Sequence, residues 1–188
     1  MYKIKGAIKG TADILFNRMT EQTKDSLRTG RRGGKMTDDD RVEEAHLKYP
    51  KDENGKAYMD SWMFKKVLAA GAGAANLKEG RRSLGPFLLA SVFVDGKIYM
   101  SPEEPSYIHE VPGKRPPKTG GACMIKRPAF ENWTASFVLN VLDDRRDAES
   151  IRVALEEAGT SIGAGSFRPE YGRFIVIEWE VIKDGKAG

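Results

Sequence analysis

The chain has 188 residues, of which 40% are hydrophobic and 31% are charged, and its formal net charge at pH 7 is +4. No apolar run approaches the roughly 20 residues of a membrane-spanning helix, and the single cysteine, Cys123, excludes an internal disulfide. We therefore expect a globular intracellular protein with a buried, unreactive thiol. The mild basic excess permits a nucleic-acid partner without requiring one.

The chain opens with an alternating pattern. From Tyr2 to Phe16, apolar residues such as Ile4 and Ile8 alternate with lysines such as Lys5. This period of two predicts one long strand, or two collinear strands if Gly10 bends the chain.

The next segment, Asn17 to Lys56, has few apolar residues and no sustained period, which predicts an insertion that is mobile or weakly structured by itself. Its most basic point contains Arg31, Arg32 and Lys35, which could grip a phosphate backbone or could simply be a solvated charge run. The Asp38 to Asp40 triplet lacks the alternating ligands of a calcium loop. We predict no metal site and no cofactor.

A helix is predicted from Asp60 to Asn76, because Asp60 or Ser61 can cap it and apolar residues follow with a helical period. The polar loop that follows makes a second basic point with Arg81 and Arg82.

From Leu84 to Met100 the chain is strongly apolar, which predicts strands, and Asp95-Gly96 predicts a two-residue hairpin turn between them. Ser101 to Gly121 is rich in proline and glycine, which predicts a loop. His109 lies in that loop and is interpreted as an ordinary surface residue.

The C-terminal third contains three more predicted elements before its last strand. Ala122 to Arg127 reads as a strand broken at Pro128, Trp133 to Leu142 as a second strand, and Asp147 to Ala158 as a helix. The final alternating segment, Arg173 to Ile182, predicts a strand whose core side chains are Ile175, Ile177, Trp179 and Val181.

A glycine-rich stretch, Ala158 to Phe174, joins that helix to that strand. Such a turn can expose backbone N–H groups that favour phosphate oxygens, and its arginines and aromatic rings could add charge and stacking faces. Alternatively, Gly159 ends the helix and the other glycines make a tight surface loop. The candidate ligand-binding residues in the stretch are Gly163, Gly165, Phe167, Arg168, Tyr171 and Arg173.

Without the insertion at 17–56 and the proline-rich loop at 101–121, the predicted order is β-α-β-β-α-β. This is the ferredoxin-like (RRM-like) α+β plan, an antiparallel sheet with helices on one face, and we expect residues 1–188 to form one such domain. The open face of this kind of sheet often binds single-stranded nucleic acid.

The plan resembles the RAMP superfamily, whose members form the backbone of CRISPR effector complexes. The matching pieces are Ile4-Lys5-Gly6, the basic insertion from Arg28 to Lys35, and the glycine stretch from Gly159 to Phe174. The C-terminal third also resembles uncharacterised phage and archaeal proteins with the segments Arg-Pro-x-Phe-x-x-Trp and Gly-x-Gly-x-x-Arg-Pro-Glu-x-Gly-Arg-Phe. Here these are Arg127 to Trp133 and Gly163 to Phe174.

The first functional hypothesis is a non-enzymatic cytoplasmic protein that coats single-stranded nucleic acid, RNA in particular, as a homo-oligomer or complex subunit. A phage-encoded protein would act in the host cytoplasm. The second hypothesis is a phage-encoded anti-defence or structural protein that binds a protein partner and no nucleic acid. The third is a nuclease using Asp38 to Asp40 with a metal, or His109 as a base. No catalytic constellation can be recognised, so we expect no enzyme.

Overall fold

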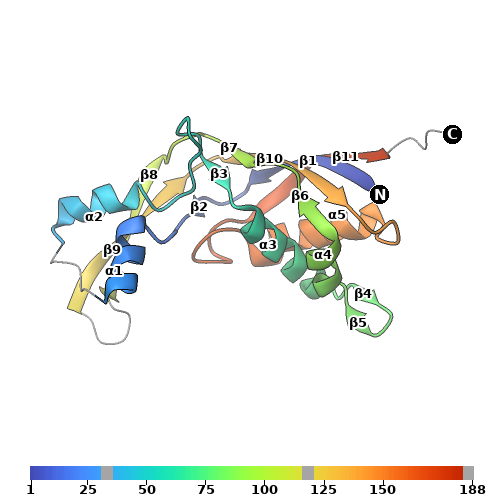
Figure 1. The fold of residues 1–188 in the computed structure, drawn as a ribbon, viewed down its shortest axis with the longest axis horizontal. Helices are drawn as coiled ribbons and strands as arrows, with labels where there is room; N and C mark the ends of the chain where they lie inside the picture. Colours follow the sequence, from blue (N-terminus) through green and yellow to red (C-terminus); the bar gives the residue numbers. More distant parts are fainter. Residues whose placement is uncertain (31–35, 116–120, 184–188) are drawn as a thin grey trace.

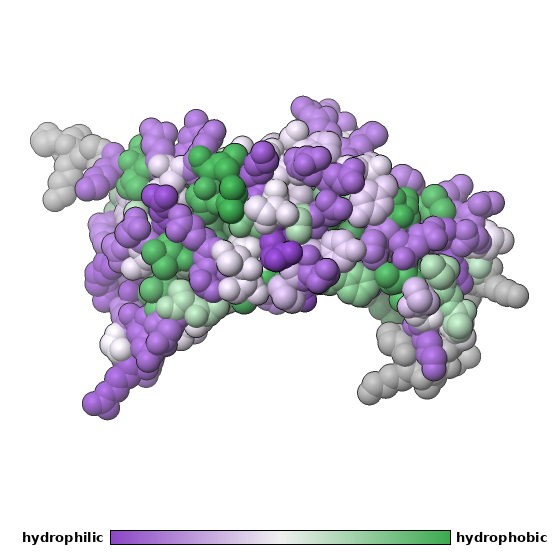
Figure 2. Space-filling model, turned by 180° about the vertical axis from the view of Figure 1, so that it is seen from behind, coloured by the Kyte–Doolittle hydropathy of each residue, from purple (hydrophilic) through white to green (hydrophobic). Residues whose placement is uncertain are grey.

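The structure, a computed structural model, describes residues 1–30, 36–115 and 121–183. It is elongated, with a layered core at one end and a projecting arm at the other (Figure 1). Seen from behind, its surface is mainly hydrophilic, and the apolar patches in that view are separated by hydrophilic residues (Figure 2). No helix among the described residues is long and apolar enough to span a membrane.

The core sheet has the strand order β11-β1-β10-β7-β3, and β6 also pairs with β10. All of these pairs are antiparallel. The strands are β1 (Tyr2–Gly10), β3 (Tyr58–Met59), β6 (Val92–Val94), β7 (Ile98–Ser101), β10 (Thr134–Val141) and β11 (Phe174–Lys183).

Helices α3 (Ser61–Ala74), α4 (Gly85–Ser91) and α5 (Ala148–Glu157) lie on one side of this sheet (Figure 1). The sequence β1, α3, β6 with β7, β10, α5, β11 is the predicted β-α-β-β-α-β order, so the ferredoxin-like α+β fold is confirmed. Asp60 caps α3 as expected, because its carboxylate accepts hydrogen bonds from the Trp62 and Met63 amides.

The predicted strand at 84–100 is wrong over its first half, where α4 forms. Pro86 lies in the first turn of this helix, and Leu84 and Leu88 are buried one turn apart. Gly85 packs so tightly against α3 that a Cβ there would lie 2.6 Å from the Ala69 carbonyl oxygen. A short apolar run is compatible with either a buried strand or a buried helix, and packing against α3 selects the helix here.

The predicted hairpin at Asp95-Gly96 is also wrong. Both β6 and β7 run antiparallel to β10, so the chain keeps its direction through these residues. The Asp95 amide donates to the Val138 carbonyl over 2.8 Å, and Gly96 has a φ of 77°. The glycine therefore interrupts the run of chain that pairs with β10 instead of turning the chain back.

The arm is built on a second sheet, with the order β2-β9-β8. Its strands are β2 (Ile14–Leu15), β8 (Tyr107–Arg115) and β9 (Gly121–Phe130). The predicted loop at 101–121 therefore contains the whole of strand β8, and Pro112 is tolerated because β8 is an edge strand. The predicted break at Pro128 does not occur. Since β2 pairs with β9, it is not a continuation of β1.

Two helices of the insertion complete the arm; the sequence predicted weak structure for this segment by itself, and here it is folded against the rest of the chain. They are α1 (Glu21–Thr29) and α2 (Asp38–Ala45), capped by the Thr20 and Thr37 side chains. Figure 1 shows both helices in the arm, where α2 packs against β9. Capping and polar contacts therefore order a segment that lacks an apolar period.

The inward face of β11 differs from the prediction. Ile175, Ile177 and Val181 are exposed, and only Trp179 of the predicted set packs against the core, together with Phe174 and Val176. The register between β1 and β11 shifts between Ala7 and Ile8, so the extra residue reverses the alternation part of the way along the strand.

Candidate nucleic-acid interface

The chain between the π-helical turn η1 (Ala158–Ile162) and β11 forms a tight loop, here called the glycine loop (residues 163–173). Gly163, Gly165 and Gly172 have φ angles of 74°, 77° and 78°. A Cβ at Gly172 would collide with the Ala164 carbonyl, and a Cβ at Gly165 with the Leu15 carbonyl. Only glycine fits these positions without strain.

The backbone donors of the glycine loop are largely used inside the protein. The Ser166 amide donates to the Leu15 carbonyl over 2.8 Å, and the Gly172 amide to the Asp13 carbonyl over 2.7 Å. The Ala164 amide donates to the Gly172 carbonyl over 2.8 Å. These bonds fasten the loop to the β2 segment, so the second interpretation, glycines for close packing, describes it better than an open phosphate nest.

The side chains of the loop meet the root of the arm. His109 of β8 and Arg127 of β9 are register partners, so their side chains lie side by side on one face of the hairpin. The Tyr171 hydroxyl lies 3.0 Å from His109 Nε2, and Arg127 Cζ lies 4.0 Å from the centroid of the Phe167 ring. We call these four residues the arm-root cluster.

The cluster offers two kinds of contact to a ligand. Phe167 is 43% exposed, so one side of its ring is open for stacking while the guanidinium of Arg127 lies on it. Burial without a counter-ion lowers the pKa of Arg127. His109 is half-buried and bonded to Tyr171, so its interpretation as an ordinary surface residue is wrong.

A neighbouring cavity of about 410 Å³ lies between β9 and the α1–α2 segment. Many of its lining side chains are basic, and we call it the basic groove. Its basic residues are Arg18, Arg41, Lys48, Lys114, Lys126 and Arg127. Cys123 also lines it and is half-buried, not fully buried as predicted.

Two of these cations are neutralised locally. Lys126 lies 2.8 Å from Asp38 and 2.6 Å from Glu110, and these hydrogen bonds raise its pKa. Lys48 lies 3.0 Å from Glu44. Within residues 1–30, 36–115 and 121–183, no carboxylate pairs with Arg18, Arg41, Lys114 or Arg127. The groove therefore carries an excess of positive charge, which favours phosphate.

The edge of β9 in this groove is closed to another strand. The carbonyl of Met124 accepts from Arg41 Nη1 over 3.1 Å, and the carbonyl of Lys126 accepts from Lys48 Nζ over 3.1 Å. Because these acceptors are occupied, strand addition is disfavoured and the side chains decide what binds.

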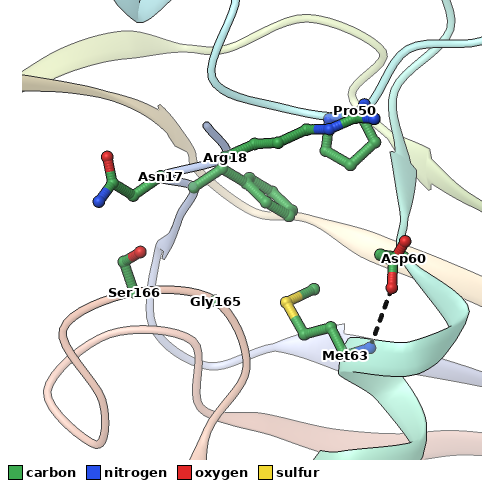
Figure 3. Close-up of a pocket in the computed structure, with 8 residues that line it drawn as sticks. Asn17, Arg18, Pro50, Asp60, Met63, Gly165 and Ser166 are labelled. Carbon is green, nitrogen blue, oxygen red and sulfur yellow. Dashed lines mark hydrogen bonds between the residues drawn. The ribbon is translucent and has the colours of Figure 1, made fainter. Parts of the chain in front are cut away.

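A smaller cavity of about 230 Å³ adjoins the groove and shares Asn17 and Arg18 with it. Figure 3 shows Asn17 and Ser166 on one side, Asp60 on the other, and Met63 between them. Since Gly165 and Ser166 line it, this cavity connects the basic groove to the glycine loop.

The structure places the predicted binding residues in three regions. Phe167, Arg168, Tyr171 and Arg173 share the glycine loop, where both arginines are exposed. Arg81 and Arg82 belong to the hairpin of β4 (Lys78–Glu79) and β5 (Arg82–Ser83). This hairpin lies at the end of the molecule that is farthest from the arm (Figure 1). The third set, Arg31, Arg32 and Lys35, lies outside the described residues.

Sequence inspection missed the basic groove. Arg18, Arg41 and Arg127 are far apart in the chain, and they line one cavity only because the α1–α2 segment folds beside β9. The available indication was the segment from Arg127 to Trp133, whose first residue joins the groove to the arm-root cluster.

The acidic triplet has a structural role. Asp38 to Asp40 form the first turn of α2, and Asp40 completes a capping box with Thr37. The hydrogen bond from the Thr37 amide lowers the pKa of Asp40. Among the residues that the structure describes, no group of three or more histidine, cysteine or acidic side chains is arranged to hold a metal.

Comparison with protein families and with curated proteins found no match. Among solved structures, the chain is similar to one in the cryo-electron microscopy structure of the Type III-B Cmr-beta complex bound to cognate target RNA, with a TM-score of 0.59 and 13% sequence identity. The match covers 97% of this chain but only 61% of that one. At this identity the likeness shows the fold alone, which agrees with the ferredoxin-like α+β plan that the sequence predicted.

Proposed function

We propose that this protein binds single-stranded RNA without cleaving it and acts as a homo-oligomer or as a subunit of a larger ribonucleoprotein complex. One observation carries the proposal: Arg127 lines the basic groove and also lies against Phe167, so a charged track and a stacking face are continuous. Single-stranded nucleic-acid sites combine these two features.

The proposed contacts follow from charge and exposure. Arg18, Arg41 and Lys114 would contact the phosphates, because no carboxylate within the described ranges neutralises them. Phe167, Arg168 and Arg173 would extend the contact along the exposed glycine loop. We propose RNA, and not DNA, as the ligand because the similar chain belongs to a complex that is bound to target RNA.

A non-catalytic role is favoured by the local geometry. His109 Nε2 is engaged by the Tyr171 hydroxyl, and Asp38 is engaged by Lys126 at the start of α2. His109 Nε2 and Asp38 Oδ2 therefore each have a structural partner, and neither atom is free to act on a substrate or to bind a metal.

Assembly into a larger particle is favoured by β11. This strand lies at the edge of the core sheet, and its exposed apolar residues are Ile175, Ile177, Val181 and Ile182. Exposed apolar edges are common protein interaction sites. The same surface supports the second candidate function, binding of a protein partner without nucleic acid.

The decisive experiment is fluorescence anisotropy with a labelled single-stranded RNA over a series of salt concentrations. Substituting Arg18, Arg41 and Lys114 together with glutamine should weaken binding and reduce the slope of log affinity against log salt by about 0.7 per lost phosphate contact. Wild-type protein that binds neither RNA nor DNA at low salt would refute the proposal and favour the protein-partner alternative.

A further inference from the structure

The arm-root cluster contains an unusual set of unsatisfied polar atoms. His109 Nδ1, Arg127 Nε and Arg127 Nη1 are buried and have no hydrogen-bond partner among the described residues. Buried polar groups in folded proteins are nearly always paired, so three such atoms on two adjacent side chains require an explanation.

The three atoms lie in one place. His109 and Arg127 are cross-strand neighbours, and both contact the same ring: Arg127 Cζ lies 4.0 Å and the His109 ring centroid 6.1 Å from the centroid of Phe167. Tyr171 holds the other imidazole nitrogen, which fixes the orientation of the His109 ring. The unsatisfied atoms therefore belong to a single, oriented site.

Phe167 contacts both residues of this site and is itself partly exposed. Its φ of 57° lies in the left-handed region, which is rarely occupied by bulky residues, and nearly half of its surface remains exposed. The loop thus holds an aromatic side chain over a cation, although the same ring would contribute more to stability if it were buried in the core. A ring face compensates a buried guanidinium only partly, whereas an anion would satisfy it.

We propose that Arg127 and His109 form a seat for one phosphate group of a nucleotide, and that Phe167 is its displaceable cover. The inference rests on the proposed function and specifies which atoms receive the phosphate. Arg127 would supply charge-assisted hydrogen bonds, and His109 would donate from Nδ1 while Nε2 accepts from Tyr171. Phosphate is the chosen anion because the basic groove leads directly to Arg127.

This phosphate could come from an internal diester of the RNA or from a terminal monoester. Both present phosphate oxyanions to Arg127 and His109. The terminal monoester carries a second negative charge near neutral pH, whereas the internal diester carries one and has chain on both sides. Two oligonucleotides of one sequence, with and without a 5′-phosphate, distinguish them. Tighter binding of the phosphorylated strand, lost in Arg127→Met, indicates a terminal phosphate, whereas equal binding of both strands with dependence on Arg127 indicates a diester.

Inorganic phosphate is the first probe, because it has no base that could stack. The chain has two histidines, so nitrogen spectra of imidazole-labelled protein contain only His109 and His46. His46 is exposed at the end of α2 and serves as the internal control. Phosphate added at constant pH and ionic strength should shift the Nδ1 resonance of His109 and leave that of His46 in place.

If Phe167 covers the seat, then removing its ring should strengthen binding. If the ring only provided a stacking face, then removing it would not strengthen binding. Phe167→Ala should bind inorganic phosphate several-fold more tightly than wild type, because the seat is open. Arg127→Met should weaken phosphate binding by about tenfold or more, and Arg127→Lys should restore part of it. Amide spectra of each variant check that the arm remains folded.

The outcomes separate this inference from the proposed function. No shift of His109 in wild type or in Phe167→Ala, or a shift unaffected by Arg127→Met, would overturn the phosphate seat, while salt-dependent RNA binding could persist through the groove. Weaker phosphate binding by Phe167→Ala would overturn the role of Phe167 as a cover. Phosphate binding at His109 without any RNA binding would support the seat and refute the proposed function.

Discussion

Helix α3 of the core buries residues along a full face, whereas helix α1 of the arm buries none. The other arm helix, α2, is attached mainly through polar contacts, including the Lys126–Asp38 ion pair and the bond from Arg41 to the Met124 carbonyl. Salt screens the exposed carboxylate of Asp38, whereas the apolar contacts of α3 carry no charge that could be screened. We infer that the core sets global stability, while the arm opens more readily and responds to salt and ligand.

The largest expected effect is in the core. Trp133 is fully buried, its ring packs edge-on against Phe174, and its Nε1 donates to the Ala12 carbonyl over 2.8 Å. Trp133→Ala should lower the free energy of unfolding by about 3–5 kcal/mol in urea titrations. The matched arm variant is Leu27→Ala, at a residue that is 67% exposed, and it should change that free energy by less than about 0.5 kcal/mol. Equal losses in the two variants would contradict the comparison.

A second variant should loosen the arm alone. Lys126→Met keeps the length of the side chain but leaves Asp38 and Glu110 without their shared cation. Amide hydrogen exchange should become several-fold faster in α2 and remain unchanged in α3. If exchange accelerates throughout the molecule, then the arm and the core unfold as one unit and the distinction fails.

A smaller effect on the free energy of unfolding is expected at acidic pH, from Asp143 at the core end of the molecule. The hydrogen bond from Arg145 lowers the pKa of Asp143 from 3.8 to about 2. A carboxylate with a lowered folded-state pKa contributes stability above its ordinary pKa, and this contribution is lost as the pH falls through the folded value. Asp143→Asn should therefore be slightly less stable than wild type at neutral pH, and the difference should vanish near pH 2. A difference that persists there would assign the effect to packing.

The smallest expected effect concerns the β4–β5 hairpin. Arg81 and Arg82 are exposed but lie at the far end from the basic groove (Figure 1). Replacing both with glutamine should reduce RNA affinity much less than the triple change at Arg18, Arg41 and Lys114, in the same anisotropy assay. A comparable loss would mean that the RNA path continues across the core.

Strong local patterns made much of the core predictable. The alternation in β1 and β10, the cap at Asp60 and the stripe of α5 each specify an element within a few residues, and their order implies the ferredoxin-like plan. The predictions failed where local pattern is ambiguous. Residues 85–91 are apolar enough for a strand or a helix, and only packing against α3 makes them α4.

The sequence by itself determined the α+β class and the order of the core elements, because periodicity and turn chemistry are local properties. The tertiary structure alone decided the arm and the candidate binding surface. Pairing of β8 with β9 brings His109 beside Arg127, and packing of α2 adds Arg41 to the same groove. Such charge clusters depend on contacts between residues distant in the chain, and no single segment of the sequence encodes them.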